Sequence, residues 1–164
     1  MEHELRVKVY EFDGEEWTSE STCWQFVIGD NANESRLVGD TLKRRVTASQ
    51  IRKYGTWILR MAIEEELAET YGYVVDETED AFNLPEEAEF KMAILISPEG
   101  MYHMMKMYPD GSWWRKWAGV QPTDIGPVTG GKIFNPIHEC FEGYELFFLD
   151  VYRDEWFFSR DCVF

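Results

Sequence analysis

The chain has 164 residues and a net charge of −15, with 31 Asp and Glu against 16 Lys and Arg. This charge argues against direct binding to nucleic acid or to an anionic membrane, because each would repel it. Hydrophobic residues make up 45% of the chain and aromatic residues 16%, which excludes a wholly disordered acidic tail. We therefore expect one folded domain over residues 1–164.

The start of the chain and its cysteines favour a protein of the reducing cytoplasm. The sequence begins MEHE, which lacks the basic and apolar regions of a secretory signal peptide. No apolar run approaches the roughly 18 residues that a membrane span needs. The cysteines Cys23, Cys140 and Cys162 are odd in number and widely spaced, so we expect no disulfide framework.

Alternating apolar residues predict two strands at the start of the chain, over residues 4–12 and 17–28. The turn residues Asp13-Gly14 separate them, as in a hairpin. The second strand is centred on the apolar run from Cys23 to Ile28.

A long helix is predicted over residues 47–71. Thr47 and Gln50 have the spacing of a capping box at its start, and Gly72 is placed to end it. Gly55 falls on the apolar face of this helix, which suggests close packing of the helix on a sheet.

The second half of the chain predicts an antiparallel sheet. Residues 76–89 are interpreted as an acidic loop, and residues 119–136 as a loop rich in Gly and Pro. Strands are predicted over 90–96, 101–108, 112–117, 145–152 and 155–164, the last two as a closing hairpin. Together these elements predict an α+β fold, in which one long helix packs on a curved, mostly antiparallel sheet of about seven strands.

Carboxylates are concentrated in residues 64–89, a stretch without Lys or Arg. The eleven acids of this stretch are our candidate partner-binding residues: Glu64, Glu65, Glu66, Glu69, Asp76, Glu77, Glu79, Asp80, Glu86, Glu87 and Glu89. Like charges repel one another, and the helix dipole disfavours anions at a helix C-terminus, so the block opposes local stability. Such a cost indicates a function. Adaptation to high salt is a poorer explanation, because it would spread the acids over the whole surface.

A second candidate binding cluster consists of Trp113, Arg115 and Trp117. Strand alternation places the three side chains on one face, and Trp and Arg dominate binding hot spots. The alternative is that this face belongs to the core, where large apolar side chains usually lie.

No motif for catalysis or cofactor binding is convincing. The run from Gly126 to Lys132 matches part of a phosphate-binding loop, but Ile133 replaces the hydroxyl residue that would hold Mg²⁺. The group His138-Glu139-Cys140 matches no zinc spacing. Pairs of carboxylates, as in glycosidases, are uninformative in so acidic a chain. We therefore expect no catalytic residues, no metal and no cofactor.

These features favour a non-enzymatic binding or inhibitor protein. Closely spaced carboxylates can imitate the phosphates of a nucleic acid and occlude a basic protein that handles nucleic acids. Phage- or plasmid-encoded antagonists of restriction or CRISPR nucleases, and immunity proteins against nuclease toxins, have this character. The alternatives are a small-molecule or carbohydrate-binding domain, or an enzyme, with an aromatic-lined pocket between helix and sheet, and an acidic subunit of a larger assembly.

Overall fold

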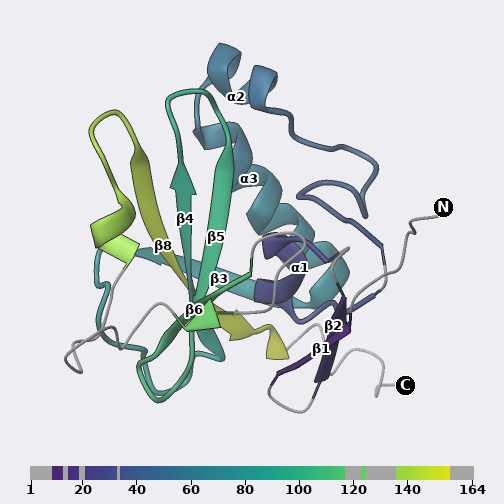
Figure 1. Cartoon of the computed structure of the whole chain (residues 1–164), viewed down its shortest axis with the longest axis vertical. Coiled ribbons are helices and arrows are strands. Elements are labelled where there is room, and N and C mark those ends of the chain that lie inside the picture. Colours follow the sequence, from purple (N-terminus) through teal and green to yellow (C-terminus); the bar gives the residue numbers. More distant parts are fainter. Residues whose placement is uncertain are drawn as a thin grey trace, which may run out of the picture.

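The computed structural model describes residues 9–12, 15–18, 21–32, 34–116, 123–124 and 136–155. The strands are β1 (Val9–Phe12), β2 (Glu15–Thr18), β3 (Tyr73–Thr78), β4 (Phe90–Ile96), β5 (Tyr102–Met107), β6 (Trp113–Arg115), β7 (Thr123–Asp124) and β8 (Glu145–Arg153). The helices are α1 (Cys23–Ile28), α2 (Ala48–Tyr54), α3 (Trp57–Glu66), the π-helical turn η1 (Leu67–Tyr71) and the 3-10 turn η3 (Pro136–Glu139). The predicted α+β class is confirmed: an antiparallel sheet, not closed into a barrel, packs against a long helix (Figure 1).

The strand order of the main sheet is β3-β8-β4-β5-β6-β7, and β1 and β2 form a separate hairpin. β8 comes late in the chain, yet it lies between β3 and β4 and pairs antiparallel with each. The closing hairpin predicted from residues 145–152 and 155–164 is therefore wrong for its first strand, whose partners are β3 and β4, and residues 156–164 lie outside the described part. This order leaves β3 at one edge of the sheet.

The ends of the predicted long helix are confirmed, but the helix is interrupted. The Thr47 side chain accepts the Gln50 N–H and the Gln50 side chain accepts the Thr47 N–H, which forms the expected capping box of α2. Gly72 ends η1 with a left-handed φ of 71°. Between them, Gly55 adopts a φ of 105° and separates α2 from α3. Gly55 is thus a break in the helix rather than a contact with the sheet.

Two predicted elements differ in type from those in the structure. The apolar run Cys23–Ile28, predicted as a strand, is α1, which begins at a capping box of Thr22 with Gln25 and ends at the left-handed Gly29. Residues from Trp24 to Ile28 are all buried, so the run carries no helical periodicity that the sequence could reveal. Part of the predicted acidic loop is β3, whose residues 76–78 pair with β8.

The sheet is covered on each face by a different part of the chain. On one face, Leu59, Ile63 and Leu67 of the long helix join a core cluster with apolar residues of β4 and β8. On the other face, Trp113 packs in a second cluster with Phe148 and with Ala81 of the segment 79–89. No helix in the described part of the chain is long and apolar enough to cross a membrane.

Candidate functional site: the acidic edge of the sheet

Most carboxylates of the acidic block lie on α3, on the edge strand β3 and on the segment 79–89. The segment 79–89 leads from the end of β3 back to β4, and Glu64 lies near the end of α3. We call the following exposed residues the acidic edge: Glu64, Asp76, Glu77, Glu79, Asp80, Glu86, Glu87 and Glu89.

Contacts between these elements bring their acids together. Arg60 of α3 forms an ion pair with Glu77 of β3 at 2.8 Å, and Glu64 follows Arg60 by one helical turn. Burial raises the pKa of Tyr152 on β8, and the negative charges of Asp150, Asp76 and Glu87 raise it further. Burial likewise raises the pKa of Tyr73, with a further contribution from Glu89 that the positive charge of Arg153 opposes. The strand and loop acids therefore share one local field around β3 and β8.

The segment 79–89 is held in place by its own hydrogen bonds and by the core. Asp80 accepts the backbone N–H groups of Phe82 and Asn83, which holds the pKa of Asp80 below its usual value. The indole N–H of buried Trp113 donates to the Ala81 carbonyl at 3.3 Å. Ala81 itself is buried. The carboxylates of this segment are thus presented from an ordered support.

The acids of the block are partly compensated within the molecule. Arg44 pairs with Glu65 at 3.0 Å and Arg60 pairs with Glu77 at 2.8 Å. Among the described residues, the other exposed acids of the block form no ion pair. Glu65 and Glu69 are one turn apart on the helix, and Glu65 reaches Arg44 in the preceding loop, so we leave these two acids outside the acidic edge.

The prediction that Glu66 and Trp113 are exposed binding residues is wrong, because both side chains are buried. Glu66 has no exposed surface, and its Oε1 accepts the Gly39 N–H at 2.6 Å. Its role is to hold the loop before α2 against the helix. Trp113 is also fully buried, so its side chain is core and is not an exposed hot spot.

The rest of the predicted Trp cluster gives no exposed site. Arg115 is half-buried on the same strand as Trp113, and burial of nearby His103, with the positive charge of Arg115, lowers the pKa of that histidine to about 3. Trp117 lies outside the described residues. The alternative that this face belongs to the core thus holds for Trp113.

A buried ion pair lies beneath the acidic edge. Lys91 Nζ lies 2.7 Å from Asp150 Oδ1, with side-chain exposures of 0% and 7%. The sheet register places Asp76 of β3 opposite Asp150 of β8, and Asp150 opposite Lys91 of β4. Lys91 thus neutralises the charge of buried Asp150, whereas Asp76, the neighbour of Asp150 on the edge strand, is exposed to solvent.

The sequence prediction missed three exposed apolar residues on α2 and α3. Tyr54, Trp57 and Met61, which we call the apolar stripe, are 54%, 50% and 57% exposed. The Trp57 indole donates to the Tyr54 carbonyl at 2.7 Å, which fixes its orientation. Trp57 and Met61 are four residues apart on α3, a spacing that defines a helix face distinct from the core face of Leu59 and Ile63, whereas Tyr54 ends α2 on the other side of the Gly55 break.

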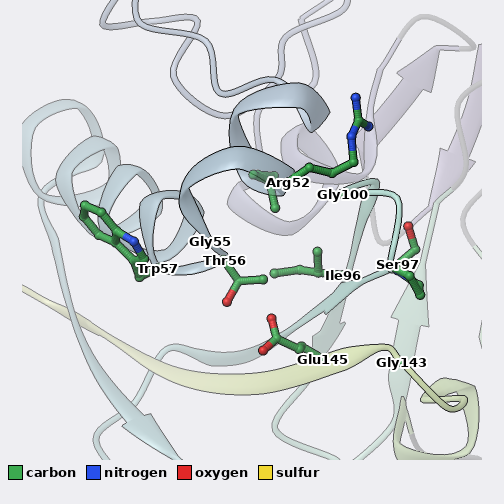
Figure 2. A pocket seen from close by; sticks show the side chains of 11 residues that line it. Arg52, Gly55, Thr56, Trp57, Ile96, Ser97, Gly100, Gly143 and Glu145 are labelled. Atoms are coloured by element: carbon green, nitrogen blue, oxygen red, sulfur yellow. The ribbon is translucent and has the colours of Figure 1, made fainter.

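A pocket of about 470 Å³ lies where the α2–α3 break meets the turn between β4 and β5 and the start of β8 (Figure 2). Figure 2 shows Thr56, Ile96 and Glu145 reaching into this pocket. Arg52, on its wall, donates through Nη1 to the Glu99 carbonyl at 2.7 Å. Among the described lining residues Trp57 is the only aromatic one, and polar residues such as Thr56 and Glu145 share the lining with apolar ones such as Ile96.

No family of known proteins matches this chain, and no curated protein matches it. Among the described residues, no three His, Cys, Asp or Glu side chains are grouped so that they could hold a metal ion. The class that the fold and surface define is therefore an α+β protein with an acidic sheet edge.

Proposed function

We propose that this protein is a non-enzymatic binding protein that uses its acidic edge to occlude a basic, nucleic-acid-handling protein. One observation carries the proposal: the exposed acids of β3 and of the segment 79–89 lie at the β3 edge of the sheet, and among the described residues only Glu77 of this group forms an ion pair. Duplex DNA presents about one charge per 1.7 Å of its axis. Carboxylates grouped on one edge can approach such a density and occupy a phosphate-binding groove.

The proposed mechanism is electrostatic and steric. The negative field attracts the basic target and speeds their encounter by about ten- to a thousand-fold at low salt. Because the segment 79–89 is anchored by Trp113 and by Asp80, little conformational entropy is lost when its carboxylates meet Arg and Lys of the target. Trp57 and Met61 of the apolar stripe supply desolvated contacts beside Glu64.

A pair of charge-reversed proteins tests the proposal. The first carries Glu64→Lys, Asp76→Lys, Glu86→Lys and Glu87→Lys on the acidic edge. The control carries Glu15→Lys, Glu16→Lys, Glu99→Lys and Glu142→Lys, four acids that are also exposed. The two proteins have the same net charge, so a difference between them reports the position of the acids and not their number.

The three proteins are immobilised and exposed to a nuclease-treated lysate of the cells in which the protein occurs, and captured proteins are identified by mass spectrometry. We expect the wild type and the control to capture a nucleic-acid-binding protein that added duplex DNA displaces. The edge variant should lose it. Equal capture by the edge variant, or capture that DNA does not affect, would contradict the proposal.

The pocket of Figure 2 supports a second candidate, a small-molecule or carbohydrate-binding protein. Its volume of about 470 Å³ suits a small ligand, and Thr56 and Glu145 offer polar groups that reach into it. A thermal-shift screen of sugars and metabolites separates the candidates. Stabilisation of the wild type that Glu145→Ala abolishes would favour the pocket, while stabilisation by a basic protein alone would favour the acidic edge.

A further inference from the structure

Among the described strands, β3 lies at the edge of the sheet and presents backbone groups that no other described strand pairs with, as well as charge. β3 pairs with β8 on one side, and no described strand pairs with its other side. Tyr73 is registered with Arg153, and the Asp154 N–H donates to the Gly72 carbonyl at 2.9 Å. Hydrogen-bonded pairs alternate along an antiparallel ladder. The N–H and C=O groups of Tyr73, Val75 and Glu77 therefore point away from β8, toward the open side.

The neighbouring ladders agree with this assignment of the backbone directions. The Glu89 N–H donates to the Val151 carbonyl, so the Val151 carbonyl faces β4. Val151 is the partner of Val75 in the register. Because the Val151 carbonyl faces β4, it cannot bond to Val75 of β3. Val75 and Val151 are therefore a non-hydrogen-bonded pair, as the alternation along the ladder requires.

The side chains around this open side favour a basic occupant. Asp76 and Glu77 are exposed on opposite faces of β3, and Glu77 is already paired with Arg60. Asp76 has another aspartate, Asp150, as its neighbour in the sheet. A residue added opposite Asp76 in an antiparallel strand would lie at a Cα distance of roughly 4.5 Å. A Lys or Arg there would compensate Asp76 as Lys91 compensates Asp150.

Taken together, we infer that β3 binds an extended, basic segment of the target protein by strand addition, with backbone hydrogen bonds to Tyr73, Val75 and Glu77 and a Lys or Arg beside Asp76. This inference rests on the proposed function and specifies how the target is held. A second copy of the chain is a poor occupant, because it would bring an identical acidic edge on a chain of charge −15 against the first. Exposed Val74, at 45%, offers an apolar contact to the added strand.

The test uses the full-length protein and a synthetic peptide, capped at each end and long enough to span β3, in which Lys and Val alternate. A second peptide of the same sequence is N-methylated at alternate residues on the edge that would face β3, which removes hydrogen-bond donors and keeps the charge. Affinities are measured by fluorescence anisotropy at low salt, and NMR follows the amides of Tyr73, Val75 and Glu77. We expect the N-methylated peptide to bind about ten-fold more weakly, a loss of about 1.4 kcal/mol. The three amides should shift and gain protection from exchange with the unmodified peptide only.

Two single variants with equal change of charge provide the control. Asp76→Lys should weaken the unmodified peptide more than Glu86→Lys, because only Asp76 is on the paired strand. Val75→Pro should also weaken it, since it removes a donor on the open side and no ladder bond to β8.

Equal binding of the two peptides, no binding of either, or unshifted β3 amides would overturn strand addition. Because the peptide comparison is made on the wild-type protein, it does not depend on the folding of a variant. The proposed function is judged separately by the four-site capture experiment. The edge variant could lose capture while the two peptides bind equally well. That result would support the proposed function and contradict strand addition alone.

Discussion

Removal of the buried Lys91–Asp150 pair should reveal how strongly the acidic edge depends on compensation from below. Lys91→Met leaves Asp150 at 7% side-chain exposure with its ion-pair partner gone, and Asp76 lies opposite it on β3. The Asp150 carboxylate, without a compensating cation, then lies between the apolar core and the negative charge of Asp76. Breaking a buried pair on one side costs about 3–5 kcal/mol of unfolding free energy. For a chain of this size, each kcal/mol lowers Tm by roughly 2–4 °C, so we expect a loss of roughly 6–20 °C.

The double variant Lys91→Met/Asp150→Leu removes both charges and should recover more than half of that loss, because apolar residues of similar volume replace buried pairs at little cost. With the single variant Asp150→Leu added, urea unfolding followed by circular dichroism gives four unfolding free energies, from which the coupling between the two sites follows. A loss below about 1 kcal/mol in Lys91→Met, or no recovery in the double variant, would refute the view that this pair is shielded from water and compensates Asp150.

Three further predictions concern other parts of the molecule. Asp76→Asn should raise the unfolding free energy by about 0.2–1 kcal/mol, because it removes a like-charge pair across β3 and β8, while it weakens capture of the basic target; an unchanged or lowered stability in chemical unfolding would contradict this. Glu66→Ala should lower the unfolding free energy by about 1–3 kcal/mol, since it leaves the Gly39 N–H without its acceptor; the matched Glu66→Gln retains an acceptor and should lose less in the same unfolding assay. The folded protein holds His103 neutral, with a pKa of about 3, whereas the unfolded chain takes up a proton near pH 6.5. This residue should therefore cost about 1.4 kcal/mol of stability per pH unit as the pH falls below 6.5, until the folded pKa is approached. Unfolding of His103→Gln across pH 7 to 4.5 should show a shallower decline than the wild type, and parallel declines would show that His103 is not the cause.

The two ends of the helix predicted over residues 47–71 could be identified from local sequence signals alone. The capping box of Thr47 with Gln50 and the stop at Gly72 are formed by neighbouring residues, so they are readable without the fold. The strand character of β3 was missed because it depends on pairing with β8, which is distant in the sequence. The run in α1 was misassigned although it has the same local signals, a capping box of Thr22 with Gln25 and a stop at Gly29, because its short apolar run was interpreted as a strand.

The candidate site was predicted in outline and corrected in detail for a similar reason. Composition located the acids of residues 64–89, but only tertiary contacts distinguish Glu66, which is bound to the Gly39 N–H, from exposed Glu64. Alternation placed Trp113 on a face of its strand, yet it could not tell that the segment carrying Ala81 covers that face. Which carboxylates are available to a partner is therefore a property of the packed molecule.

The late arrival of β8 has a consequence for synthesis on the ribosome. β3 and β4 do not pair with each other; each has β8 as its neighbour, and β8 begins only at Glu145. Until that stretch has left the ribosome, β3 lacks the strand that it pairs with in the finished sheet, and pairing over such a sequence separation forms slowly. A nascent chain would therefore carry the carboxylates of residues 76–89 beside an unpaired β3, and the acidic edge would form only after residues 145–153 have left the ribosome.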